Sequence, residues 1–348
     1  MAVTIKDVAA LAGVSTSTVS RVCNDNPSIS KETRDRVRKA MAELGYEVSS
    51  PAAPTTSKSL KMIGIILPAS LSKTFENTFY LKSIRGISQF CNARQYASTI
   101  ITGRDDQEIL KAVQDLAAND QVEGFIMLYS KKDDPIVDFL LENGILYVVI
   151  GKPHQFSNQT ICIDNDNLLA GREATDYLYD LGHRRIAYVG PDNGPMFSAD
   201  RKSGYQLSLL QHQLPLDPEF CIEIDYQSSE RPEQLCSLLQ REDRPTAIVV
   251  SDDILALTIE RTCSQIDLSI PKDISILSFN NSLFATLTSP QLTSVDINSF
   301  QLGFEAASQI INHAENANLM ASKIIVPHSI VERDSCRRLH HKNKENKP

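Results

Sequence analysis

The chain has 348 residues, a formal net charge of −8, and 42% hydrophobic residues. This length and apolar content favour two or three globular domains and exclude a disordered chain. The acidic balance excludes a protein that coats nucleic acid with its whole surface, but residues 1–58 carry eight Lys and Arg against six Asp and Glu. Any DNA-binding surface is therefore expected in this N-terminal part.

The cysteines and the apolar runs indicate the cellular compartment in which the protein is expected. The seven cysteines are odd in number, scattered, and never in a Cys-x-x-Cys pair, which favours free thiols over disulfides or a zinc site. The longest apolar runs, 62–67 and 145–150, are too short to span a bilayer, and no signal-peptide pattern opens the chain. We expect a cytoplasmic protein with no membrane partner, no metal and no cofactor.

The N-terminal 45 residues contain start and stop signals for three short helices. Thr4 with Asp7 is a capping-box pattern, and Gly13 supplies the left-handed residue that ends the first helix. Ser15 caps the second helix and Ser30 caps the third. The inward positions expected from helical periodicity are Val8, Leu11, Ala12, Val19, Val22, Val37, Met41 and Leu44. A helix, a tight turn with glycine, a second helix and a supporting helix form the helix-turn-helix plan.

The second of these helices has the composition of a helix that reads the major groove. Its outward positions are Ser17, Ser20, Arg21 and Asn24. Short side chains allow close approach, and the fork of Arg21 can reach O6 and N7 of guanine. Ser15, Thr18 and the helix N-terminus suit phosphates. The alternative interpretation is a small helical bundle with solvated serines.

Between Tyr46 and Lys61 the composition shifts to Pro, Ala, Ser and Thr with no apolar periodicity, which indicates a linker. This shift divides the chain into four parts. We expect a DNA-binding headpiece at 1–47, a linker or atypical hinge at 48–60, a core at 61–335 and a charged disordered tail at 336–348.

Beyond the linker, strand-like runs alternate with amphipathic stretches. The strand-like runs are Met62–Leu67, Ser98–Thr102, Gly124–Leu128, Leu146–Ile150, Arg185–Gly190, Ala247–Ser251 and Ile274–Phe279. The helix-like stretches are Leu81–Arg94, Glu108–Ala118, Asn167–Leu181, Gly204–Gln211 and Asp253–Ser264. Repeated βα units predict parallel sheets with helices on both faces. The pattern is too long for one sheet, so we expect two similar α/β lobes, with a ligand cleft at the carboxyl ends of the strands.

Enzyme signatures are absent from the sequence, which has no Gly-x-Gly-x-x-Gly after a strand, no phosphate-binding loop, no His-Glu-x-x-His and no Gly-x-Ser-x-Gly. His183 is either a base or, as we favour, a cation at the end of the preceding helix. Asp252 and Asp253 form either an acid–base or metal pair or, as we favour, a rim that accepts hydrogen bonds from sugar hydroxyls. His340 and His341 lie in the charged tail and are expected to be solvated.

Several of these segments resemble one known family. Residues 3–9, 12–15, 18–22, Asn24, Val37 and 41–46 resemble the headpiece of the lactose/galactose repressor (LacI/GalR) family. Core segments continue the resemblance at 63–64, 85–87, 122–124, 164–165, 181–186, 200–205, 251–256 and 290–295. The family implies an α/β fold: a three-helix headpiece and a two-lobed core like periplasmic binding proteins, made of two Rossmann-like parallel-sheet subdomains. Residues 151–153, 164–167 and 296–298 are similar to the maltose-operon repressors of Gram-positive bacteria.

The resemblance implies residue roles. The implied DNA-binding residues are Thr4, Ser15, Thr16, Ser17, Thr18, Arg21 and Asn24, with Thr16, Ser17 and Arg21 at base-reading positions. The implied effector-binding residues are Phe79, Tyr80, Tyr129, Lys152, Phe197, Arg201, Asp252 and Asn280. Arg201 and Asp252 match the sugar-binding arginine and its polar partner, which can fork onto vicinal hydroxyls.

Two features of the core match the family pattern less closely. Phe79 and Tyr80 stand where the family has an aromatic side chain that stacks on a pyranose, although core aromatics would give the same pattern. Asn280 stands where most members carry aspartate.

By analogy the lobes are discontinuous, with an N-lobe at 61–164 and 293–324, a C-lobe at 165–291 and 325–335, and crossings near Asp164, Leu292 and Ile325.

We expect a homodimeric transcription repressor that binds double-stranded operator DNA, since one headpiece makes too small an interface for strong specificity. A small carbohydrate, with maltose or a maltodextrin as the first choice, would control it from the cleft. A periplasmic-type sugar-binding protein and an unrecognised α/β enzyme are the alternatives.

The linker departs from the family pattern. Family members form a hinge helix whose leucine enters the minor groove, but the corresponding positions here are Val48, Ser49, Ala52, Ala53 and Thr55. Pro54 opposes a helix there. The sequence therefore predicts an extended linker without a hinge helix.

Overall fold

The computed structural model describes residues 4–23, 29–46, 60–69, 77–118, 121–191, 195–224 and 232–339. The chain divides into two compact units, Met1–Ser59 and Leu60–Pro348. Within the described ranges, no helix is both long and apolar enough to cross a bilayer.

Three helices form the described part of the first unit: α1 (Ile5–Ala12), α2 (Thr16–Cys23) and α3 (Lys31–Leu44). The predicted caps are present. The Thr4 N–H donates to Asp7 Oδ2 at 2.8 Å, and the Thr33 N–H donates to Ser30 Oγ at 3.3 Å. Gly13 has a φ of 66°, a left-handed conformation that suits glycine and ends α1.

The headpiece core consists of small and β-branched side chains. Its buried members are Val8, Ala9, Ala12, Val19, Val22, Val37 and Ala40, with Met41 and Leu44 half-buried against them. The expectation that Leu11 faces inward is wrong, because this side chain is 48% exposed. α1 packs on α2 and α3 through positions 8, 9 and 12, where short residues allow close approach, and this leaves position 11 outside.

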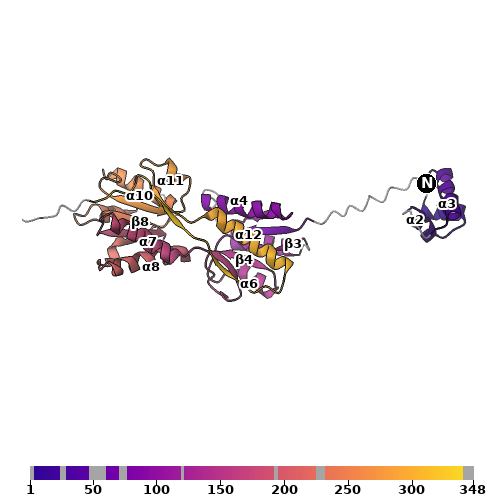
Figure 1. Ribbon diagram of the computed structural model, residues 1–348, viewed down its shortest axis with the longest axis horizontal. Coiled ribbons are helices and arrows are strands. Elements are labelled where there is room, and N and C mark those ends of the chain that lie inside the picture. Colours follow the sequence, from indigo (N-terminus) through magenta and orange to yellow (C-terminus); the bar gives the residue numbers. More distant parts are fainter. Residues whose placement is uncertain are drawn as a thin grey trace, which may run out of the picture. The chain divides into compact units, whose positions relative to one another are not determined.

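The second unit has two lobes, each built on a six-stranded sheet (Figure 1). In the N-lobe the strand order is β11-β5-β4-β3-β1-β2, and every pairing is parallel. The strands are β1 (Met62–Ile66), β2 (Ala97–Ile101), β3 (Val122–Met127), β4 (Tyr147–Ile150), β5 (Ile161–Asp164) and β11 (Lys323–Ile325). The helices are α4 (Thr78–Ala93), α5 (Asp106–Ala117), α6 (Pro135–Glu142) and α12 (Ser299–Glu315). α4 and α12 pack on one face, and apolar side chains of α5 and α6 pack on the other.

In the C-lobe the strand order is β12-β10-β9-β8-β6-β7, with only β12 antiparallel to its neighbour. The strands are β6 (Ile186–Pro191), β7 (Cys221–Ile224), β8 (Ala247–Val250), β9 (Ser275–Phe279), β10 (Thr293–Asp296) and β12 (Ser329–Val331). The helices are α7 (Asn167–Asp180), α8 (Met196–Gln211), α9 (Glu233–Leu239), α10 (Asp253–Gln265), α11 (Phe284–Leu287) and a 3-10 turn at Pro218–Phe220. The two sheets establish the predicted fold class.

The chain crosses between the lobes three times. The first crossing follows β5, the second follows β10, and the third joins β11 to β12. The second crossing lies at Ile297 and Asn298 and not near Leu292 as expected. Residues 293–295 pair with β9 in the C-lobe sheet, so the chain leaves that lobe only after the strand has ended.

The expectations for the C-terminal tail and for His183 are also wrong. Cys336–Leu339 were expected to be a disordered tail, but the Leu339 N–H donates to the Leu181 carbonyl at 2.7 Å, and the Arg337 N–H donates to Ser275 Oγ at 3.1 Å. His340 and His341 lie outside the described residues.

His183 was expected to be a helix-capping cation. It is 1% exposed, and its ring nitrogens contact Thr246 Oγ1 at 2.9 Å and the Arg337 carbonyl at 3.2 Å. Burial lowers the pKa of His183 to about 4, so a neutral imidazole ties the C-terminal segment to the start of β8.

Candidate DNA-reading helix and effector site

The described headpiece residues place the predicted DNA-binding hydroxyls around the start of α2. Ser15 Oγ accepts the Thr18 N–H at 3.2 Å and contacts Thr18 Oγ1 at 2.9 Å, so this serine is the N-cap. Thr16 is exposed in the first turn. Thr4 is exposed before α1, where its hydroxyl donates to Asp7.

Three of the predicted DNA-binding residues are not fully described. Ser17 and Arg21 belong to α2, but their side chains lie outside the described part of the structure, and Asn24 lies outside it entirely. Their roles remain predictions.

Arg201 lies on α8 and is 2% exposed. Its Nε donates to Asn167 Oδ1 at 2.9 Å, and its Nη1 donates to the Ser251 carbonyl at 2.6 Å. The guanidinium carbon lies 4.8 Å from the ring centroid of Phe197 and 4.2 Å from that of Phe279. Burial lowers the pKa of Arg201 to about 10, which leaves it a cation at neutral pH. The result is a planar cation in a fixed orientation.

Asp252 follows β8, caps α10 and is 3% exposed. Its Oδ1 accepts the Leu255 N–H at 2.9 Å. Burial raises the pKa of Asp252 to about 6; the charge of Asp253 adds to this shift, and Arg201 opposes it. Asp252 therefore acts on Arg201 through its charge, while the hydrogen bonds of Arg201 go to Asn167 and Ser251.

A second carboxyl, which is half-buried, lies within electrostatic range of Arg201. Asp164 ends β5, and its Oδ1 accepts the Asn165 N–H at 2.8 Å and Asn167 Nδ2 at 3.0 Å. Burial raises the pKa of Asp164 to about 6, against the effect of the hydrogen bond from Asn165 and the charge of Arg201. The surroundings of Arg201 thus combine one cation, two carboxyls and two aromatic rings, a set that suits a polyhydroxyl ligand.

Asp253 does not belong to the predicted carboxylate rim. It is 1% exposed; its Oδ1 accepts the hydroxyls of Ser278 at 2.5 Å and Ser294 at 2.7 Å, and its Oδ2 accepts the Ser282 N–H at 2.6 Å. These bonds tie α10 to the strands and loop beside it. Within the described residues, no group of three or more His, Cys, Asp or Glu side chains is placed to hold a metal ion.

The N-lobe supplies three aromatic candidates. Phe79 and Tyr80 lie in the first turn of α4, half-buried, with ring centroids 5.2 Å apart, and both pack against the core. Burial raises the pKa of Tyr80 to about 12. Tyr129 follows β3; burial and the charge of Asp134 raise its pKa. None of the contacts described for these rings involves Arg201, so they remain separate candidates.

Two lysines of the N-lobe reach the C-lobe. Lys152, in the loop after β4, forms an ion pair with Asp200 of α8 at 3.1 Å. Lys82 of α4 donates to the Asn281 carbonyl at 2.7 Å. The ion pair places the predicted effector residue Lys152 beside Asp200, which precedes Arg201 in the chain. The ammonium group of Lys152 is therefore already paired with a carboxylate. Asn280, half-buried after β9, adopts a φ of 94° and donates its N–H to the Val295 carbonyl at 2.8 Å.

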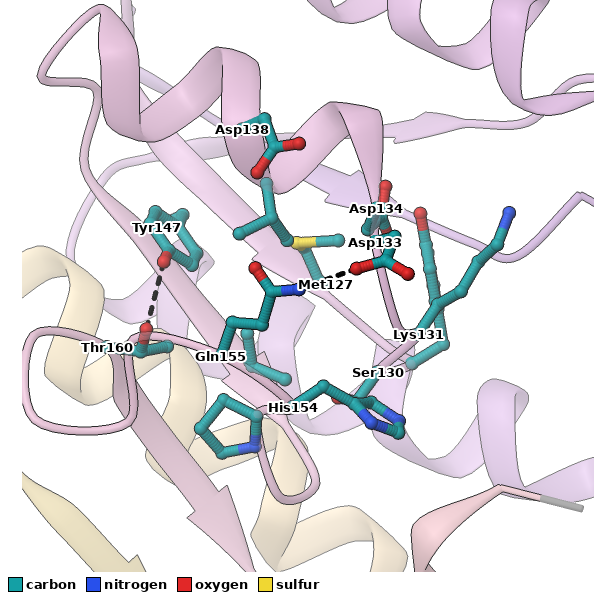
Figure 2. Close-up of a pocket in the computed structure, with 14 residues that line it drawn as sticks. Met127, Ser130, Lys131, Asp133, Asp134, Asp138, Tyr147, His154, Gln155 and Thr160 are labelled. Carbon is teal, nitrogen blue, oxygen red and sulfur yellow. Dashed lines mark hydrogen bonds between the residues drawn. The ribbon is translucent and has the colours of Figure 1, made fainter.

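A cavity opens beside Tyr129 on the side of the N-lobe sheet that faces α6 (Figure 2). In its wall, Gln155 Nε2 donates to Asp133 Oδ1 at 2.8 Å, and the hydroxyls of Tyr147 and Thr160 lie 2.9 Å apart. Of the predicted effector residues only Tyr129 lines this cavity. The buried hydrogen bonds around Arg201 make that cluster the stronger candidate for the effector site.

Sequence reasoning missed Phe279, Asn167 and Ser251 as residues that surround Arg201. Phe279 is the last residue of an apolar strand, and nothing in the local pattern separates it from a core side chain. Asn167 lies in the Asp-Asn-Asp-Asn segment already singled out, and that segment was the available signal.

Comparisons with known proteins place the chain in a family. Residues 4–49 match the model of bacterial regulatory proteins of the lacI family, and residues 175–336 match a periplasmic binding protein-like domain. The chain is 35% identical to the HTH-type transcriptional regulator MalR of Streptococcus pneumoniae over 346 residues, covering 96% of this chain and 100% of the relative.

Two solved structures show the same fold. A complex of the transcriptional regulator CelR with cellobiose superposes with a TM-score of 0.73 at 26% identity, covering 96% of this chain and 100% of the other. A transcription regulator-like protein from Staphylococcus haemolyticus superposes with a TM-score of 0.71 at 31% identity, covering 80% and 99%. The helix-turn-helix unit, the two α/β lobes and the near full-length similarity establish that this chain belongs to the lacI family of bacterial regulatory proteins and is a DNA-binding transcriptional regulator, not an enzyme.

Proposed function

We propose that this regulator represses a sugar-utilisation operon by binding operator DNA through α2, and that an uncharged sugar held at Arg201 controls its affinity for the operator. The observation that carries the proposal is the buried guanidinium of Arg201, fixed between Phe197 and Phe279 with two of its five N–H groups already bonded. The remaining donors and the nearby carboxyl of Asp252 can share vicinal hydroxyls.

The charges around Arg201 favour a neutral ligand over a sugar phosphate. Lys152 is paired with Asp200, and Lys82 donates to a backbone carbonyl. Half-buried Asp164 and buried Asp252 lie within electrostatic range of Arg201, and burial raises the pKa of each to about 6. A phosphate would therefore be repelled by both carboxylates, whereas a neutral sugar would not.

Maltose or a short maltodextrin is the first choice of sugar. The similarity to the MalR regulator supports it, and the CelR complex with cellobiose supports a disaccharide in this fold. The working unit would be a cytoplasmic homodimer on a pseudo-palindromic operator, because a two-fold protein reads half-sites about one helical turn apart.

A ligand panel tests the proposal. We expect maltose or maltotriose at 100 times its Kd to stabilise the chain by about 2.7 kcal/mol in thermal unfolding. The same sugar should change operator affinity in a fluorescence anisotropy titration. Glucose 6-phosphate and sucrose serve as comparison ligands. A panel in which only a phosphorylated sugar stabilises the chain would overturn the assignment of a neutral effector.

A further inference from the structure

All three crossings between the lobes meet at one side chain. Asn165 begins the first crossing, directly after β5, and is 4% exposed. Its Nδ2 donates to the Ile297 carbonyl, in the second crossing, at 3.0 Å. The same Nδ2 donates to the Val326 carbonyl, in the third crossing, at 2.8 Å.

The chemistry of an amide explains why asparagine suits this position. The Ile297 and Val326 carbonyls lie just outside the sheets that their chain segments connect, and both residues are buried, at 4% and 3% exposure. Buried carbonyls need donors, and a side-chain amide carries two N–H groups on one nitrogen. The Asn165 amide therefore satisfies one carbonyl of the second crossing and one of the third, and holds both to the backbone of the first crossing.

Other hydrogen bonds near Asn165 also join the crossings to one another. The Val326 N–H donates to the Asp164 carbonyl at 2.8 Å, so the first and third crossings are also joined by main chain. Asn298 Nδ2 donates to the Pro327 carbonyl at 2.6 Å, but this residue is exposed and links only the second and third crossings. Within the described residues, Asn165 alone donates its side chain to both of the other crossings.

We propose that Asn165 is the pivot of lobe opening: a positioning residue that keeps the three crossings at one point, so that the lobes rotate as rigid bodies. The regulatory use of this rotation rests on the proposed function, whereas the mechanical role does not. Without the amide, only the Val326–Asp164 main-chain bond and the exposed Asn298 would join the crossings, and ligand binding between the lobes would set their relative orientation less strictly.

Hydrogen exchange of the full chain without ligand tests the pivot. Asn165→Asp keeps the shape of the side chain but replaces two donors with lone pairs that face two carbonyls. Asn165→Ala removes the donors without adding charge and serves if the first variant does not fold. We expect exchange at the Val326 amide to accelerate at least tenfold in either variant, while Ile126 and Val249, at the centres of the two sheets, exchange at the wild-type rate.

The matched control is Asn298→Gly, which keeps the positive φ of 52° and removes a bond between two crossings only. We expect less than a threefold change at Val326. Wild-type exchange at Val326 in the Asn165 variants, or equal acceleration at all three amides, would overturn the pivot, since the second result describes a general loss of stability.

A second measurement connects the pivot to regulation. The factor by which maltose changes operator Kd should fall at least fivefold in Asn165→Ala, with maltose affinity measured separately by calorimetry. If maltose leaves operator binding of the wild-type chain unchanged, the sugar assignment fails, and the exchange experiment alone decides the role of Asn165.

Discussion

Arg201 is held in one orientation by its neighbours, because two rings and two hydrogen bonds fix its guanidinium. Lysine lacks the planar fork. Hydrogen bonds to a charged group contribute about 1.5–3 kcal/mol. We therefore expect Arg201→Lys to weaken sugar binding about 10- to 100-fold in calorimetry.

Lys202 provides the control for this substitution. It lies on the same helix and pairs with Glu223 at 3.1 Å, away from Arg201's partners. Lys202→Ala should bind the sugar as the wild type does. A similar loss of affinity in both variants would mean that α8, and not the guanidinium of Arg201, is responsible.

Asp252 makes stability depend on pH in the opposite direction to a salt-bridged carboxylate. Burial raises its pKa to about 6, whereas an unfolded aspartate titrates near 3.9. Between these pH values the folded chain retains a proton that the unfolded chain has lost. The free energy of unfolding therefore falls as pH rises from about 4 to 6, and the loss persists at pH 7.

Asp252→Asn keeps an N-cap acceptor for α10 and removes the charge. We expect its free energy of unfolding at pH 7 to exceed the wild-type value by about 1–3 kcal/mol in urea titrations. At pH 4.5 the difference should shrink. The free energy of unfolding of the variant will still depend partly on pH, because the pKa of Asp164 is also raised. Equal differences at both pH values would contradict a buried charge at position 252.

At the scale of elements, the loop after β4 and helix α8 are joined by the ion pair between Lys152 and Asp200. An exposed pair contributes up to about 1 kcal/mol. We expect Lys152→Glu to weaken sugar binding by up to about fivefold, because two carboxylates would then oppose closure of the lobes. The charge-swapped pair, Lys152→Glu with Asp200→Lys, should restore affinity, and 0.5 M salt should reduce both effects.

The ion pair of Lys61 with Glu123 is a matched control, since its 2.8 Å contact has similar exposure but lies wholly within the N-lobe. Lys61→Glu should leave sugar affinity unchanged. Failure of the swapped pair to restore affinity would indicate that the Lys152 ammonium contacts the sugar directly.

Helix α2 carries the prediction about DNA reading. Arg21→Ala should cost about 1–3 kcal/mol of specific operator binding and relax the preference at one base pair, because a bidentate contact to guanine is lost. Competition binding with single-base operator variants measures both effects. An Arg21→Ala chain with wild-type affinity and selectivity would remove this residue from base reading.

The elements also show what the sequence can and cannot predict. All seven strands and all five helices predicted for the core are present, because each is a strong apolar run or an amphipathic stretch. β7 alternates buried and exposed residues over only four positions, and β11 and β12 are three-residue edge strands. Strands this short carry little pattern of their own, and partners from distant parts of the chain determine them.

The sequence likewise predicts some residues of the candidate effector site and not others. Arg201 and Asp252 were found through motif resemblance, and the structure places both in one buried cluster. Phe279 and Asn167 were not found, because their roles depend on which strands lie beside α8 in three dimensions. Asp253 was misassigned, since adjacent residues at a strand end point in different directions and its bonding partners are 25 and 41 residues away.

For the whole molecule, the sequence of the linker carries a prediction about DNA bending. Residues 47–59 lie outside the described residues, so the prediction rests on sequence: Pro54 opposes a hinge helix, and Thr55 is too short and polar to wedge between bases. We expect weak bending of operator DNA in energy-transfer measurements on end-labelled duplexes. The triple variant Ala53→Arg, Pro54→Ala, Thr55→Leu should bend DNA more and bind it more tightly. A sharp kink with the wild-type chain would contradict the prediction.

Helices α4 and α12 of the N-lobe pack closely at two glycines. A side chain on Gly86 would clash with the Phe300 carbonyl, and one on Gly303 would clash with the Ser83 carbonyl, so α4 and α12 are in backbone contact. α12 begins directly after the second crossing, and α4 follows the first strand of the core. Helices packed this closely move together, so the N-lobe should turn as one rigid body when the lobes open or close. A graded level of transcription would then reflect the fraction of molecules that hold sugar at a given concentration.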